Sequence, residues 1–143
     1  MIGLGSGARS YTNQLHYSTE YAVKSKAVLG IIHDFIGRGA EQYGQVDFGF
    51  ELSEDDQRRR FVILSLLQTE GLCRDSYRSR FQAGGNDALD DLPELLDLVV
   101  NGLAEVNNDR IVLTESGLEY SDAIGPWLYS QTVQSRMEAY ECR

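Results

Sequence analysis

The stretch that decides the predicted fold is residues 87–113, DALDDLPELLDLVVNGLAEVNNDRIVL. Its first part carries apolar side chains at helical spacing on one face: Leu89, Leu92, Leu96, Val99 and Leu103. Gly102 closes this predicted helix. Two short apolar runs come next, at residues 103–106 and 110–113, on either side of a turn-forming Asn-Asn-Asp segment. The stretch therefore predicts a helix followed by a β-hairpin.

Two elements are predicted near the start of the chain. Ser18 and Thr19 are candidate N-caps for a helix of about 18 residues, which ends at the glycines of residues 37–39. The apolar stripe of this helix is Val28, Ile31, Ile32 and Phe35. Residues 46–52 then alternate between apolar and polar side chains, and this alternation predicts a half-buried strand.

A second group of elements lies between residues 53 and 81. Acids at residues 54–56 follow Ser53 and predict the first turn of a helix, where the helix dipole favours negative charge. Residues 61–67 are apolar nearly all round, which predicts a central, buried helix that stops at Gly71. A short helix is predicted at residues 76–81.

Two further helices are predicted after the hairpin. Thr114 caps the first of them, and Pro126 is suited to the first turn of the last. The order helix, short helix, helix, hairpin, helix is that of a winged helix-turn-helix. The predicted fold class is therefore α+β, mainly helical with a small β component.

A winged helix commonly reads DNA through the helix before the wing. In this chain that helix is acidic, with Asp87, Asp90, Asp91, Glu94 and Asp97, and residues 81–109 contain no lysine or arginine. The formal net charge of the chain is −9. Because phosphate neutralisation supplies most of the affinity for nucleic acid, we expect no nucleic-acid partner.

A group of arginines argues against this expectation, because arginine side chains can bind phosphate. It consists of Arg58, Arg59, Arg60, Arg74, Arg78 and Arg80. We expect these side chains to form surface ion pairs with neighbouring acids such as Glu54, Asp55 and Asp56. This arrangement would leave little free positive charge for a phosphate backbone.

No catalytic or metal site is predicted. Cys73 and Cys142 form neither a metal-binding nor a disulfide pattern, and we expect both thiols to be reduced. His33 is expected to be packed or on the surface, whereas a role for His16 stays open. The chain has no run of about 18 apolar residues, so we expect no membrane span and a cytoplasmic location.

Three segments resemble the carboxy-terminal part of oxygen-independent coproporphyrinogen III oxidase-like radical S-adenosylmethionine (SAM) enzymes. Residues 3–10, GLGSGARS, resemble the glycine-rich last barrel strand and its following turn, and residues 49–59 resemble the entry to the carboxy-terminal domain. Residues 102–103 and 113–117, with the closing aromatic helix, resemble its wing and the segment after the wing. Residues 9–12 and 121–130 are more similar to a bacterial paralogue subfamily, so the resemblance leaves the substrate open.

The resemblance implies cofactors for a longer parent protein. Such a parent binds a [4Fe–4S] cluster through a CxxxCxxC motif and cleaves S-adenosylmethionine, and this chain lacks the motif. Gly5, Ala8 and Arg9 would belong to the segment that lines the S-adenosylmethionine pocket, with Arg9 where the oxidase has an apolar residue. The fingerprint Gly3-x-Gly5-x-x-Ala8 also fits a dinucleotide site formally, but its required strand and helix are not evident.

The resemblance also implies a division of the chain. Residues 1–45 would be a remnant of the barrel end, a glycine-rich turn plus a helix, and residues 46–143 a winged-helix-like carboxy-terminal domain. This domain would cover the substrate side of the amino-terminal radical SAM barrel, with a tetrapyrrole-like small molecule as the implied substrate and no catalysis by the chain alone. The amino-terminal arm, residues 1–17, is expected to be poorly anchored, or to pack in a non-physiological way, without the barrel. A protein-interaction or regulatory winged helix that binds a basic partner is the alternative, and a DNA-binding regulator is the third.

Overall fold

The computed structural model describes residues 1–20, 25–81 and 86–139 of the 143-residue chain. The chain divides into two compact units: Met1–Ser53 form the first, and the second begins at Glu54. The predicted division lies between residues 45 and 46. In the structure the strand at residues 48–51 pairs inside the first unit, so the two units divide after that strand.

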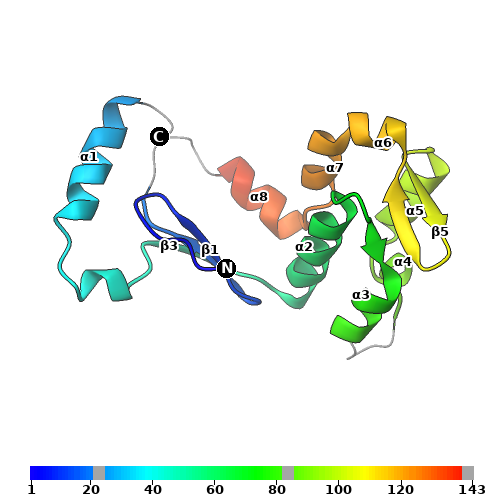
Figure 1. The fold of residues 1–143 in the computed structure, drawn as a ribbon, viewed down its shortest axis with the longest axis horizontal. Helices are drawn as coiled ribbons and strands as arrows, with labels where there is room; N and C mark the ends of the chain where they lie inside the picture. Colours follow the sequence, from blue (N-terminus) through cyan, green and yellow to red (C-terminus); the bar gives the residue numbers. More distant parts are fainter. Residues whose placement is uncertain (21–24, 82–85, 140–143) are drawn as a thin grey trace. The chain divides into compact units, whose positions relative to one another are not determined.

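The first unit contains an antiparallel sheet with the strand order β1-β2-β3 (Figure 1). Its elements are β1 (Arg9–Tyr11), β2 (Leu15–Ser18), α1 (Ser25–Ile36), the 3-10 helix η1 (Gln42–Gly44) and β3 (Phe48–Glu51). The turn between β1 and β2 is stabilised by the Thr12 hydroxyl oxygen, which accepts a hydrogen bond from the Leu15 amide at 2.9 Å. The β1–β2 hairpin thereby places Tyr11 opposite His16.

The amino-terminal arm is anchored within the chain, contrary to the predicted loose arm. The Gly3 amide donates to Ser10 Oγ at 3.0 Å, and the Gly7 amide donates to Thr19 Oγ1 at 2.8 Å. The Tyr11 amide donates to the Met1 carbonyl at 2.8 Å. These bonds give backbone groups of the arm partners within the chain, in place of the neighbouring barrel strand that the resemblance implies. The assignment of residues 1–45 to a barrel end stays a prediction.

The first helix begins later than its predicted caps. Ser18 closes strand β2, and the described helix α1 starts at Ser25. The Thr19 hydroxyl accepts a hydrogen bond from the Gly7 amide at 2.8 Å, and residues 21–24, which a cap at Thr19 would contact, lie outside the described residues. The predicted end is confirmed, because the Gly37 amide donates to the His33 carbonyl at 3.0 Å just beyond Ile36.

The predicted strand at residues 46–52 is shorter and more exposed than expected. It spans Phe48–Glu51 and pairs with β2. Val46 and Phe48 are 48% and 51% exposed, although the alternation assigned them to a buried face. Strand β3 lies at the edge of a three-stranded sheet, and only Phe50 and Leu52 on that face are half-buried.

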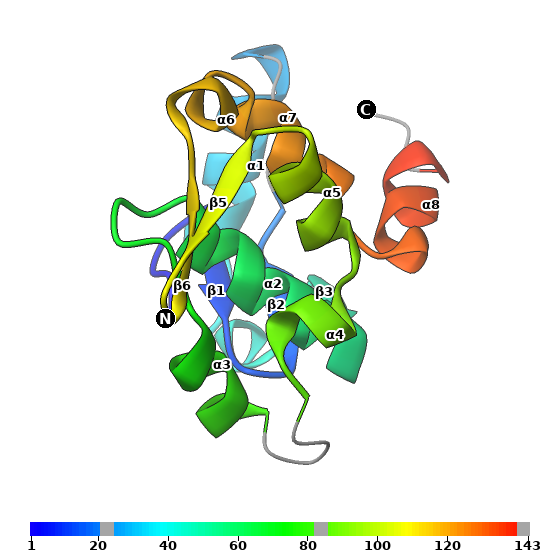
Figure 2. The ribbon, with the colours of Figure 1, turned by 90° about the vertical axis from the view of Figure 1, so that its right-hand side faces the viewer.

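The second unit combines helices with a small antiparallel sheet of order β4-β6-β5 (Figure 2). Its elements are α2 (Glu54–Leu66), β4 (Leu72–Cys73), α3 (Arg74–Arg80), α4 (Ala88–Asp91), α5 (Glu94–Val100), β5 (Ala104–Asn107), β6 (Arg110–Leu113), α6 (Glu115–Glu119), α7 (Ser121–Trp127) and α8 (Gln131–Ala139). The predicted α+β class is confirmed. The predicted elements occur in the predicted order, but β4 was not predicted, the helix before the hairpin is divided into α4 and α5, and three helices rather than two follow the hairpin. The winged-helix assignment stays a prediction.

One hydrophobic core holds the second unit together. Its fully buried apolar residues are Val62, Leu66, Leu72, Tyr77, Ala88, Leu92, Leu95, Leu98, Ala104, Ile111, Ile124 and Leu128. Only one face of α2 enters this core, because Leu64 is 55% exposed; Leu67, just beyond the end of the helix, is 38% exposed. The prediction of a helix buried all round was therefore wrong for α2.

The predicted helix at residues 87–101 is interrupted. Helix α4 ends at Asp91 and α5 begins at Glu94, with Pro93 between them. Proline lacks an amide hydrogen and disfavours helical backbone at the residue before it, so Leu92 leaves the helical region. The break shifts the buried face: Leu95 is fully buried, whereas Leu96, which the spacing placed inside, is 47% exposed.

The predicted hairpin and the Thr114 cap are confirmed, whereas α2 ends at Leu66, before the predicted stop at Gly71. Strands β5 and β6 pair across a turn in which Asn108 has a positive φ of 53°. Gly71 also has a positive φ, 68°, after the end of α2. Thr114 caps α6 by accepting a hydrogen bond from the Gly117 amide at 3.1 Å. Pro126, by contrast, lies in the last turn of α7 rather than at the start of the last helix.

Candidate functional site: an apolar groove in the second unit

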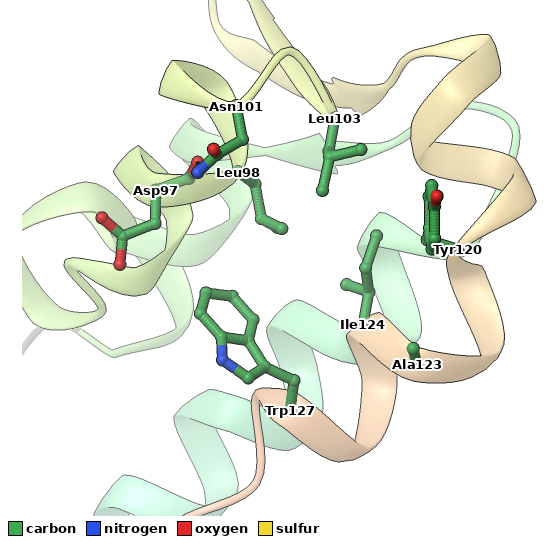
Figure 3. Close-up of a pocket in the computed structure, with 8 residues that line it drawn as sticks. All are labelled: Asp97, Leu98, Asn101, Leu103, Tyr120, Ala123, Ile124 and Trp127. Atoms are coloured by element: carbon green, nitrogen blue, oxygen red, sulfur yellow. Dashed lines mark hydrogen bonds between the residues drawn. The ribbon is translucent and has the colours of Figure 1, made fainter.

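An open apolar groove with a cavity volume of about 270 Å³ lies between α5 and α7 (Figure 3). Its lining residues are Asp97, Leu98, Asn101, Leu103, Tyr120, Ala123, Ile124 and Trp127. Leu98 and Ile124 belong to the buried core, with 3% and 4% exposure, and form the floor. Tyr120 and Trp127 are 58% and 45% exposed. The groove is thus an accessible extension of the core that ends in two aromatic side chains.

The backbone around Leu103 fixes the shape of this groove. The Leu103 amide donates to the Leu98 carbonyl at 2.8 Å, and the Leu103 carbonyl accepts the Thr114 amide at 3.0 Å. Gly117 of α6 packs directly on the Leu103 carbonyl, where an added Cβ would lie 1.9 Å from the oxygen. This close approach holds α6 and the following helix against the end of α5.

Two polar residues, Asp97 and Asn101, lie on the α5 side of the groove (Figure 3). The Asn101 side-chain amide donates to the Asp97 backbone carbonyl at 2.7 Å, so it serves the end of the helix. Within the described ranges, no residue forms a hydrogen bond or ion pair with the Asp97 carboxylate. Asp97 therefore presents an uncompensated negative charge beside an apolar surface.

The surroundings of the groove are acidic as well. From residue 86 to residue 130 the sequence has Arg110 as its one basic residue. The Arg110 side chain lies at the hairpin turn, where it donates to the Glu70 carbonyl at 2.9 Å. Exposed acids follow the groove on α6 and α7: Glu115, Glu119 and Asp122.

Some of the acids of residues 87–97 are neutralised by arginines of the fold. This corrects the prediction from sequence, which found no positive charge near this segment. Arg74 Nε donates to both carboxylate oxygens of Asp87 at 3.0 Å. Arg78 also binds Asp87, and it binds Asp109 at 2.9 Å. These arginines come from α3, so charges that are far apart in sequence neutralise each other in the fold.

Helix α2 supplies the second set of arginine contacts. Arg59 binds Glu94 at 3.0 Å and its expected neighbour Asp55 at 2.9 Å, and it also donates to the Leu128 carbonyl at 3.1 Å. Arg58 lies 3.6 Å from Asp91. The prediction of pairing with neighbouring acids is confirmed for Arg59–Asp55 and for Arg58–Glu54 at 3.7 Å, and the longer-range pairs were not predicted.

The contacts in this network shift the pKa values of Tyr77 and Asp87. Burial raises the pKa of Tyr77 above its ordinary value, and the hydrogen bond that its hydroxyl donates to Asp91 at 2.8 Å adds to the shift. Burial alone would raise the pKa of Asp87, but hydrogen bonds from Arg74, the Leu89 amide and Arg78 lower it below the usual range. The ionised form of Asp87 is therefore favoured by folding.

We expect Asp87→Asn to destabilise the protein by about 1–3 kcal/mol at neutral pH, because two arginines lose a charged acceptor. The folded-state pKa of Asp87 is lowered, so its stabilisation is present above the unfolded pKa of about 3.9 and is lost as pH falls through the folded value. Urea denaturation between neutral and strongly acidic pH should show a smaller loss of stability in the variant. Asp97→Asn is the control, with a change of about 0.5 kcal/mol or less.

We expect duplex DNA to bind only weakly and without sequence preference at physiological salt, about 0.15 M. Arg58, Arg59, Arg74 and Arg78 are engaged with carboxylates, and the formal net charge is −9. A fluorescence titration with duplexes of different sequence is the measurement. Sub-micromolar, sequence-dependent binding would contradict the expectation.

The site residues predicted from resemblance lie in the first unit. Gly5 is exposed with a φ of 109°, and its carbonyl accepts the Ala8 amide at 3.2 Å. Arg9 begins strand β1. The glycine turn therefore leads into a strand rather than the helix that a dinucleotide fingerprint requires. The assignment of Gly5, Ala8 and Arg9 to an S-adenosylmethionine pocket stays a prediction.

The histidines and Cys73 form no metal centre in the described part of the chain. His33 is exposed, and His16 stacks on Tyr11 with ring centroids 4.2 Å apart. Cys73 caps α3 by accepting a hydrogen bond from the Ser76 amide at 3.4 Å. No group of three or more candidate metal-ligating side chains is found across residues 1–20, 25–81 and 86–139. The [4Fe–4S] cluster that the resemblance implies for the parent protein needs three cysteine ligands, and these residues do not supply them.

The sequence interpretation missed the groove. Its α7 side is formed by Tyr120, Ala123, Ile124 and Trp127, whose spacing of three or four residues marks one helical face. This spacing, together with the chain's single tryptophan, was the signal in the sequence that could have indicated the groove.

The helices of the described segments contain none that is long and apolar enough to cross a membrane.

Comparison with known protein families gives a match that lies almost entirely in the second unit. The model of the HemN C-terminal domain matches residues 52–120, from just before α2 to the end of α6. No curated protein and no solved structure matches the chain. The matched span contains most of the core of the second unit and reaches Tyr120 on the groove.

Proposed function

Because residues 52–120 place this chain in the HemN C-terminal domain family of coproporphyrinogen III oxidase-like radical SAM proteins, we propose that it is the substrate-side cover domain of a radical SAM oxidoreductase. The family match is the observation that carries the proposal. The matched residues supply most of the core of the second unit, and a core of its own is what a domain docked on a separate catalytic barrel requires.

The chemistry belongs, on this proposal, to an amino-terminal radical SAM barrel of the same parent protein. That barrel holds the [4Fe–4S] cluster and S-adenosylmethionine, whose cleavage supplies a radical. This chain contributes no cluster ligands, and it is not catalytic by itself. Gly5, Ala8 and Arg9 would approach S-adenosylmethionine only when the barrel is complete. We place the parent in the cytoplasm, where thiols such as Cys73 stay reduced.

The groove is a poor site for the tetrapyrrole-like substrate that the family suggests. Such substrates carry several carboxylates, and the groove is bordered by Asp97 with no basic lining residue. Like charges at close range would weaken binding. We therefore propose that the substrate side of this domain is a different face from the groove.

We expect the chain alone to form no stoichiometric iron–sulfur cluster and to release no 5′-deoxyadenosine from S-adenosylmethionine. The reason is that Cys73 and Cys142 are its only cysteines, against the three ligands that the chemistry needs. Anaerobic reconstitution followed by iron, sulfide and product assays is the measurement. A stoichiometric cluster on the chain would contradict the expectation.

The proposal itself is tested on the full-length gene product under the same conditions. It should bind about four iron atoms and cleave S-adenosylmethionine, and Cys73→Ser in that product should leave both properties unchanged. A full-length product without iron would overturn the radical SAM assignment. Deletion of residues 54–139 should preserve the cluster and abolish turnover of substrate, and full turnover after deletion would overturn the cover role.

A second candidate function is a protein-interaction module. The exposed apolar groove beside an uncompensated carboxylate favours it over a DNA-binding regulator.

A further inference from the structure

The groove has the composition of a protein-docking site. Its lining is almost entirely apolar, and Tyr120 and Trp127 are roughly half exposed at its edge. Exposed tyrosine and tryptophan beside a hydrophobic pocket are typical of positions that contribute most to binding at protein interfaces. In Figure 3 Leu98, Leu103, Ile124 and Trp127 border an open space between α5 and α7, and the Asp97 carboxylate lies at its outer edge, pointing away from it. This surface is not needed to close the core, because Leu98 and Ile124 are already buried beneath it.

The dimensions favour side chains over a whole small molecule. The cavity volume of about 270 Å³ is below the range of roughly 300–1,000 Å³ that is usual for drug-sized ligands. An open groove formed by two helices suits the apolar face of an added helix, whose anchor residues recur every three or four positions. One or two such anchors would lie between Leu103 and Trp127.

The charge of the groove decides the chemistry of the partner. Asp97 lies on one wall without an ion-pair partner in the described ranges, and no basic residue lines the groove. Arg110 is the one basic residue between residues 86 and 130, and it is bound at the hairpin turn. An acidic partner would be repelled, whereas a lysine or arginine beside the anchors would pair with Asp97.

We propose that this groove binds a short amphipathic helix of a protein partner, with apolar anchors in the groove and a basic side chain against Asp97. The partner is distinct from the catalytic barrel's substrate, and the site does not depend on the proposed radical chemistry. The folded chain is sufficient for the interaction, because all lining residues come from the second unit.

The test uses a displayed library of 16-residue helices with leucine, isoleucine or phenylalanine at positions i, i+3, i+4 and i+7. The remaining positions vary among lysine, glutamate, glutamine and alanine. Selection is carried out on the whole chain, and the enriched peptides are synthesised with a fluorescent label. We expect enriched helices to be net basic, with Kd values of about 1–100 μM by anisotropy. A scrambled peptide of the same composition should bind at least about tenfold more weakly.

Two variants locate the binding on the groove. Asp97→Lys should weaken the basic helices about tenfold or more, and Asp122→Lys, which makes the same change of net charge outside the groove lining, should weaken them less than about threefold. Ala123→Glu places a bulky charged group in the groove at an exposed helical position and should abolish binding. Circular dichroism melts establish that each variant is folded.

Each outcome of the binding experiments either supports or overturns the proposal. Loss of binding in folded Asp97→Lys and Ala123→Glu, with binding retained in Asp122→Lys, supports the proposal. Absence of any enriched helix, enrichment of acidic or uncharged helices, or equal binding of the scrambled peptide would overturn it. Equal weakening by Asp97→Lys and Asp122→Lys would also overturn it, because attraction would then depend only on net charge.

Discussion

Replacing Gly117 with alanine is expected to destabilise the second unit by about 3–5 kcal/mol, among the largest effects of a single methyl group. The added Cβ would lie 1.9 Å from the Leu103 carbonyl oxygen and 2.9 Å from its carbon. Both are backbone atoms, so no side-chain rotation relieves the overlap. The Leu103 carbonyl must therefore move, and that movement breaks the hydrogen bond it accepts from Thr114.

Gly125 is the matched control for this prediction. It is also buried in a helix, yet an added Cβ would make ordinary contacts of 3.8 Å with Ile63 and Leu67. Gly125→Ala should stabilise α7 by up to about 1 kcal/mol, because alanine favours helix over glycine. Urea denaturation followed by the fluorescence of Trp127 measures both. Similar unfolding midpoints for the two variants would mean that α6 does not pack on Leu103 as described.

The second large effect is expected from Leu92→Ala, which should cost about 2–5 kcal/mol. Leu92 is fully buried at the break between α4 and α5, where its removal leaves a cavity in the core. Leu96→Ala should cost less than about 1 kcal/mol, because the Leu96 side chain is 47% exposed. The uninterrupted helix that the sequence predicted would make both substitutions costly, so the difference between them, measured by urea denaturation, distinguishes the two registers.

Asp91 is a further residue whose predicted role changes. In the sequence Asp91 is one of the acids that disfavour nucleic acid. In the structure Asp91 accepts the Tyr77 hydroxyl at 2.8 Å and lies beside Arg58, so we expect Asp91→Asn to be destabilising.

Features determined by neighbouring residues were predicted well from the sequence. The β5–β6 hairpin depends on the turn preference of residues 107–109, and the α6 cap depends on a threonine three residues before Gly117. The interrupted α4–α5 helix was missed for a local reason, because the leucine spacing was followed through Pro93. A proline inside a periodic pattern argues against one continuous helix.

Features that join distant segments were not predictable in the same way. The Arg74–Asp87 pair spans 13 residues, and the Arg59–Glu94 pair spans 35. The groove needs residues from α5, the approach to β5, and α7, and no single stretch shows its shape. Composition indicated the acidic charge correctly, but only the fold shows that Asp87 is neutralised and that Asp97 is not.

The contacts of Arg59 and Asp56 bear on where the folding unit ends. The family match ends at Tyr120, yet Ile124 and Leu128 beyond it complete the core. Arg59 donates to the Leu128 carbonyl, and buried Asp56 accepts the Ser130 hydroxyl at 2.6 Å. A piece shortened to the matched span would leave both α2 side chains without these partners and would uncover the apolar face of α2. The smallest autonomous module must therefore extend to at least Ser130, ten residues past the limit at which sequence similarity stops.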